Sequence, residues 1–150
     1  MCWRSLLAIL VALAPGCAPS ADRQAAAMTP THAATAERSL QTRRYDTNDR
    51  ALIMQATIGV LQDLGFTIEE TQAQYGVIVA SKLAGSRIRA QVVLHAATEG
   101  QAISVRANFQ RVGFAPGASI AHGDTIADPY IYQGFFEKLS QSVFLTAHEI

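Results

Sequence analysis

Four strand-like runs follow one another through the middle of this chain, separated only by short, turn-prone connections. They cover residues 66–71, 76–82, 87–97 and 102–110. Connections this short can join only antiparallel neighbours, because a parallel crossover needs a dozen or more residues. The sequence therefore predicts an antiparallel sheet of consecutive strands, with a further short strand candidate at 40–45.

The last two runs alternate strictly between apolar and polar side chains. Such alternation is typical of a sheet with one face in the core and one in solvent. The run at 76–82 is apolar on both faces, so we expect it to be the most covered strand. The apolar positions of the last two runs are Ile88, Ala90, Val92 and Leu94, then Ile103, Val105, Ala107 and Phe109.

A helix is predicted at 48–64, where apolar residues recur at helical spacing. Thr47 or Asp46 is expected to cap its first amides. Gly65 can adopt the left-handed conformation that ends a helix, and Phe66 would then fold back on Leu61 in a Schellman motif.

A second helix is expected from Asp128, with Pro129 in its first turn, after a loop at 113–127. The predicted order is strand, helix, four strands, helix. We therefore expect an α+β domain with an antiparallel sheet of four to five strands and two helices packed on one face. The apolar stripe assigned to the second helix is Ile131, Tyr132, Phe135, Phe136, Leu139, Val143 and Leu145.

The N-terminus has the three parts of an export signal: a positive charge at Arg4, an apolar run at 6–13 and small residues at 14–16. Cys17 follows directly. The arrangement resembles the lipobox of bacterial lipoproteins, which implies a cleaved signal at 1–16 and a diacylglycerol thioether on Cys17. An ordinary secretory signal with an incidental cysteine is the alternative. Both predict export.

Cys2 is lost with the signal and Cys17 would be acylated, so we expect no disulfide. The segment 17–38 is interpreted as the lipidated cysteine and a flexible tether with a reach of about 25 Å. A partly helical, Ala-rich arm is the alternative. Residues 39–150 are long enough for a single domain. Ala18, in place of the aspartate that retains lipoproteins in the inner membrane of enteric bacteria, favours the outer membrane.

The sequence predicts no catalytic or metal site and no cofactor. His32, His95, His122 and His148 are scattered through the tether, a strand, a loop and the chain end. Glu69 and Glu70 are adjacent on a predicted strand, so they should point to opposite faces. Because twelve Lys and Arg residues balance twelve Asp and Glu residues, bulk binding of nucleic acid is not expected.

Cations concentrate between Lys82 and Arg111, where the single acidic residue is Glu99. Arg87, Arg89 and Arg106 fall on the polar faces of adjacent predicted strands. They are the candidate anion-binding residues, able to pair with phosphate or carboxylate. The alternative is a solvated face on which arginines serve solubility.

Three sequence blocks, at 61–66, 76–82 and 128–147, resemble an uncharacterised family of small proteobacterial lipoproteins. The predicted order of elements is similar to the helix-grip domains of the β-barrel-assembly accessory lipoprotein. The family has no established activity from which residue roles could be carried over. From the export signal and the absence of catalytic motifs we expect a membrane-anchored, non-catalytic interaction or structural module of the envelope, with an envelope protein partner. The alternative is a module that binds an anionic envelope ligand (lipopolysaccharide, a phospholipid headgroup or peptidoglycan) through the arginine-bearing face.

Overall fold

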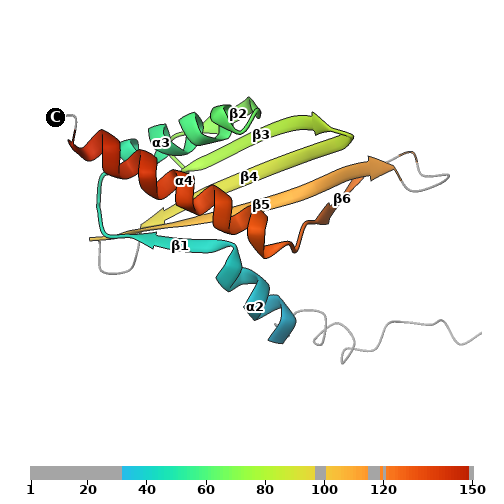
Figure 1. Cartoon of the computed structure of the whole chain (residues 1–150), viewed down its shortest axis with the longest axis horizontal. Helices are drawn as coiled ribbons and strands as arrows, with labels where there is room; N and C mark the ends of the chain where they lie inside the picture. Colours follow the sequence, from blue (N-terminus) through green and yellow to red (C-terminus); the bar gives the residue numbers. More distant parts are fainter. Residues whose placement is uncertain (1–31, 97–100, 115–118, 120, 149–150) are drawn as a thin grey trace, which may run out of the picture. The chain divides into compact units, whose positions relative to one another are not determined.

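Six strands and three helices make up the part of the chain that the computed structural model describes, which is residues 32–96, 101–114, 119 and 121–148 (Figure 1). The predicted signal, Cys17 and the first part of the tether lie outside the described residues. In chain order the elements are α2 (His32–Leu40), β1 (Thr42–Tyr45), α3 (Arg50–Asp63), β2 (Thr67–Gln72), β3 (Val77–Ala84), β4 (Ser86–Ala96), β5 (Ile103–Phe114), β6 (Ala121–Thr125) and α4 (Pro129–His148).

The strands form one antiparallel sheet in the order β1-β5-β4-β3-β2, with β6 also paired to β5. Strands β2 to β5 are the four predicted runs, and their short connections make them antiparallel neighbours as expected. Strand β1 pairs with the first residues of β5 and β6 with the last, so these two short strands share one edge of the sheet.

Helices α3 and α4 lie side by side across one face of the sheet (Figure 1), which confirms the predicted covering of that face by two helices. The alternating apolar positions of β4 and β5 are buried beneath them, apart from the partly buried Ile88, together with Ile78 and Ala80 of β3. Strand β3 is also buried at Val79 and Ser81 on its other face, so it is covered on both sides as predicted. At the centre of the core, the ring of Phe109 contacts those of Phe66, Tyr132 and Phe135.

The ends of α3 show which local signals decide a helix boundary. Its N-cap is Asp49, whose Oδ1 accepts a hydrogen bond from Leu52 N at 2.9 Å, so the predicted caps Thr47 and Asp46 were wrong. Thr47 Oγ1 instead accepts from the Asp49 amide. The Schellman motif is confirmed: Gly65 has φ +80°, and Phe66 N donates to the Leu61 carbonyl at 2.9 Å.

Helix α4 begins as predicted, with Asp128 Oδ1 accepting from Tyr130 N at 3.0 Å and Pro129 as the first residue. Tyr132, Phe135, Phe136 and Leu139 are fully buried and Val143 is partly buried. Two members of the predicted stripe were wrong, since Ile131 is 39% and Leu145 60% exposed. At 3.6 residues per turn, Leu145 falls on the side of the helix away from Tyr132, and Ile131 falls at the edge of the stripe.

Two elements lie in segments whose main prediction was irregular: α2 agrees with the alternative of a partly helical arm, and β6 lies in the predicted loop. Helix α2 occupies the last part of the predicted tether, because its alanines favour helix. Its end is held by buried Gln41, whose backbone N–H donates to the Glu37 carbonyl at 3.1 Å. Strand β6 lies in the predicted loop at 113–127, and β5 extends into that loop as far as Phe114. All five β6 residues are exposed, so main-chain pairing with β5 forms this strand without an apolar pattern.

Candidate functional site

The three candidate arginines share the helix-free face of the sheet, but the strand register does not bring all three together. Arg89 lies opposite Gln110, whereas Arg106 lies opposite Val93, an offset of four residues. At about 3.4 Å per residue this separates the two positions by roughly 13 Å. Arg87 and Arg89 are exposed and two residues apart on β4, so these two form the exposed cationic pair.

Arg106 has a structural partner. Its Nη2 donates to Gln41 Oε1 at 3.0 Å, and the Gln41 carbonyl accepts from the amide of Ala107 at 2.9 Å. Arg106 therefore holds the junction of α2 and β1 against β5. It also lines a shallow hollow of about 230 Å³ on the helix-free face, together with Gln91, Val93, His95 and Asn108.

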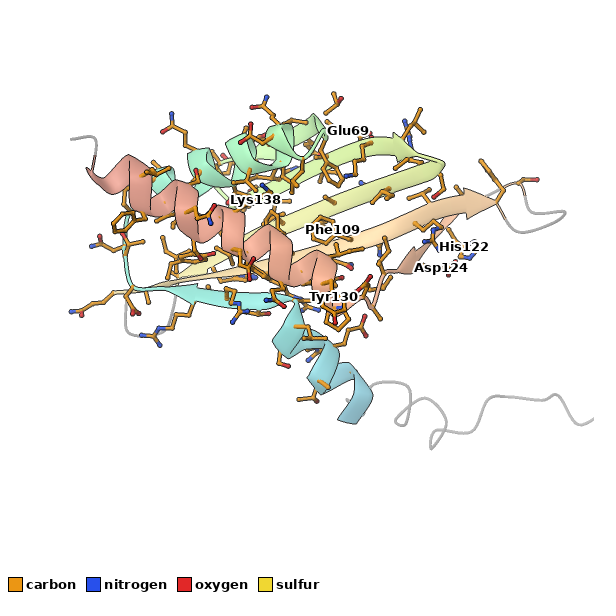
Figure 2. All side chains as sticks on the ribbon, viewed as in Figure 1. Glu69, Phe109, His122, Asp124, Tyr130 and Lys138 are labelled. Atoms are coloured by element: carbon orange, nitrogen blue, oxygen red, sulfur yellow. The ribbon has the colours of Figure 1, made fainter. Side chains whose placement is uncertain are left out.

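The adjacent carboxylates of β2 do not point to opposite faces as predicted. A β-bulge between Ile68 and Glu70 makes Glu69 the extra residue of the strand. Ser81 Oγ donates to Glu69 Oε1 at 2.5 Å, while Glu70 lies opposite Val79 on the same face as Ser81. Both carboxylates therefore lie on the helix-free side, with Glu69 at the β2 edge (Figure 2).

Large apolar side chains are exposed where the β3–β4 hairpin and the end of β5 meet. Leu83 is 83% and Phe114 70% exposed. Leu83 lies opposite Arg87, which in turn lies opposite Val112, so this end of the helix-free face combines apolar side chains with the arginine pair. We call Leu83, Arg87, Val112 and Phe114 the sheet tip.

A groove opens on the helix-covered side, between the first half of α4 and the end of α3. Its volume is about 290 Å³. The sheet supplies its floor through Ile88 and Phe109, and Phe135 and Tyr130 border it from α4 (Figure 2). The full lining is Leu64, Phe66, Lys82, Ile88, Phe109, Ile126, Tyr130, Ile131, Gly134, Phe135 and Lys138.

Two lysines accompany this apolar lining. Lys82 shares its face of β3 with Ile78 and Ala80, and its Nζ donates to the Leu64 carbonyl at 3.1 Å while lying 4.5 Å from the centre of the Phe66 ring. Lys138 is exposed on α4. The sequence reasoning counted Lys82 only as part of a charge excess. Lys82 lies two and four residues from buried Ala80 and Ile78 on the same strand. This spacing is the sequence signal that could have placed Lys82 on the core side.

Among the described residues, no carboxylate or histidine joins Lys82 and Lys138 in the lining of the groove. His95 lies on the helix-free face, while His122 lies in β6, not in a loop, with Nε2 3.3 Å from Asp124 Oδ1 (Figure 2). Burial raises the pKa of Tyr45 above its usual value, against the opposing effects of its hydrogen bond with Ser140 and the charge of Arg43. Within the described ranges, no three His, Cys, Asp or Glu side chains gather as a metal site would require.

The sequence matches no known family model, and no curated protein shows significant similarity to it. Among the described helices, none has both the length and the hydrophobicity needed to cross a bilayer.

Proposed function

We propose that this chain is a lipid-anchored, non-catalytic module of the bacterial envelope, attached through Cys17, that acts by docking to an envelope protein. The sheet tip supports the docking role. Leu83 and Phe114 expose most of their apolar surface although the core is complete without them. Clustered exposed apolar side chains are typical of interaction surfaces.

Anchoring is tested by metabolic labelling with a fatty-acid analogue. The wild-type chain is expected to incorporate label and to fractionate with the outer membrane. The Cys17→Ser chain, in which only one side-chain atom differs, is expected to incorporate none. A wild-type chain that takes up no label would contradict the lipoprotein assignment.

Docking is tested by placing a photo-crosslinking residue at position 83 in intact envelopes. We expect one discrete protein adduct from position 83 and none from Gln55, an exposed residue of α3 that serves as the matched control. A Phe114→Glu change should reduce the adduct at 83 because a charge at the tip opposes burial there. Equal labelling from both positions would show that the tip has no preferred partner.

An anionic phospholipid surface is the second candidate partner, and the proximity of Arg87 to Leu83 favours it. Each arginine near an anionic membrane contributes about 1 kcal/mol, so Arg87→Gln with Arg89→Gln should weaken binding to phosphatidylglycerol vesicles by about 30-fold. The assay uses the Cys17→Ser chain, which has no acyl anchor. Arg38→Gln with Arg44→Gln removes equal charge elsewhere and should have a much smaller effect. Equal losses in both double variants would exclude a specific role for the tip.

A further inference from the structure

We infer that the groove beside α4 binds the single chain of an anionic amphiphile, with its head group held by Lys82 and Lys138. This site is distinct from the sheet tip and does not depend on the proposed docking role. Figure 2 shows Lys138 on α4 and Phe109 on the neighbouring strand β5, the polar and apolar sides of the proposed site.

The apolar part of the groove suits one hydrocarbon chain. Its floor and walls include Ile88, Phe109 and Phe135, and its volume of about 290 Å³ lies just below the usual range for ligand sites, roughly 300–1,000 Å³. A branched or two-chain lipid needs more room. Transfer of an alkyl chain from water to such a lining is favourable because it removes apolar surface from water.

Gly134 keeps this space open. It lies within α4, where glycine is less favourable than alanine, and a Cβ atom placed there would have no neighbour within 4 Å. A larger side chain at 134 would therefore enter the groove without meeting existing atoms at its Cβ.

The two lysines of the groove favour an anionic head group. Lys82 and Lys138 have no acidic partner within ion-pair distance among the described residues. The neighbouring carboxylate of Glu137 accepts a hydrogen bond from Gln133 along α4, and Glu69 is bonded to Ser81 on the other face of the sheet. Lys82 uses one of its three N–H donors on Leu64, so two remain for an anion. An anionic head group would supply the missing counter-charge beside the apolar lining.

The test uses decanoate with the full Cys17→Ser chain, because the protein's own acyl groups are then absent. Equilibrium dialysis should show saturable binding of one decanoate per chain. Decanol should bind at least tenfold more weakly, and decyltrimethylammonium more weakly still, because the lysines favour an anion. In an isotope-labelled sample, decanoate should shift the NMR signals of Lys82, Ile88 and Gly134.

Gly134→Leu should fill the groove and reduce decanoate binding by at least tenfold. Gly59→Leu is the matched control, since Gly59 is also a helical glycine whose added Cβ meets nothing within 4 Å, and it lies in α3 outside the groove lining. Lys138→Met should weaken decanoate binding while leaving decanol binding unchanged, because one of the two lysine charges is lost and Lys82 remains. Since Lys138 is exposed, this variant should keep the fold, which keeps the test valid even if Gly134→Leu does not fold.

Three results would overturn the inference: equal binding by the Gly134→Leu and Gly59→Leu chains, decanol binding as tight as decanoate binding, or NMR shifts confined to residues outside the groove. None of these bears on the crosslink from position 83. Failure of the groove proposal is therefore distinguishable from failure of the docking proposal.

Discussion

Among the described glycines, Gly76 is the one at which an added Cβ would meet another backbone, and Gly76→Ala tests this close approach. The residue has φ +68°, and its carbonyl accepts a hydrogen bond from Leu94 N at 2.8 Å. An added Cβ would lie 2.7 Å from the Leu94 carbonyl oxygen and also against the Arg50 guanidinium. The flexible end of Arg50 can move, but the backbone of β4 cannot move without disturbing the sheet.

The expected cost has two parts. A non-glycine residue in the left-handed region costs about 1–2 kcal/mol. Displacing a packed backbone costs about a further 1–3 kcal/mol, as overpacking does in protein cores. Gly76→Ala should therefore lower the free energy of unfolding by about 2–5 kcal/mol.

Gly85→Ala is the control that separates the two parts. Gly85 has φ +70°, but a Cβ there would meet nothing within 4 Å, so only the conformational cost of about 1–2 kcal/mol applies. Urea unfolding followed by circular dichroism measures both variants. If the two losses in the free energy of unfolding agree within about 0.5 kcal/mol, the close approach at Gly76 adds no cost to the substitution and the reasoning is refuted.

Three further changes test the core and its boundary. Gly65→Val should cost more than about 1 kcal/mol, because it forces a β-branched residue to φ +80° at a position where an added Cβ meets nothing within 4 Å; an unchanged unfolding midpoint would contradict the Schellman ending. Phe135→Ala should cost about 3–5 kcal/mol, since its ring is 2% exposed and packs at 5.5 Å from Phe109; a loss below about 1 kcal/mol would mean that the ring is not in the core. Because burial raises the pKa of Tyr45, its protonated form is favoured in the folded state. Stability from this group is therefore complete below the unfolded pKa of about 10 and is lost as pH rises through the folded pKa. Tyr45→Phe should remove that loss in urea midpoints measured across alkaline pH, and an identical decline in both proteins would exclude this assignment.

Local signals in the sequence were sufficient for most of the architecture. The alternation in β4 and β5 identified the buried face, and the short connections identified antiparallel neighbours. Gly65 and Asp128 marked helix ends correctly because a left-handed cap and an Asp-Pro start depend on a few adjacent residues. The prediction missed β6 because its residues have no apolar pattern. It placed Leu145 on the buried side of α4, although the helical repeat puts this residue on the opposite side.

The candidate site was less accessible to sequence reasoning. Parity along the strands correctly predicted that Arg87, Arg89 and Arg106 share a face, but only the register shows that Arg106 lies four positions from the row of Arg89. The β2 bulge likewise brought Glu69 and Glu70 to the same face, because a single extra residue interrupts the regular alternation of side chains along a strand.

Patterns among neighbouring residues were enough to predict the α+β class, the apolar faces of β4 and β5, the end of α3 at Gly65 and the start of α4 at Asp128. The export signal before Cys17 stays a prediction. Contacts between distant parts of the chain followed only from the three-dimensional packing. Lys82 and Lys138 are brought to one groove by the packing of α4 on the sheet, and the space between them stays open because residue 134 has no side chain. Periodicity specifies which way a residue faces. Register and packing specify which distant residues it faces, because these depend on contacts between elements that no local pattern encodes.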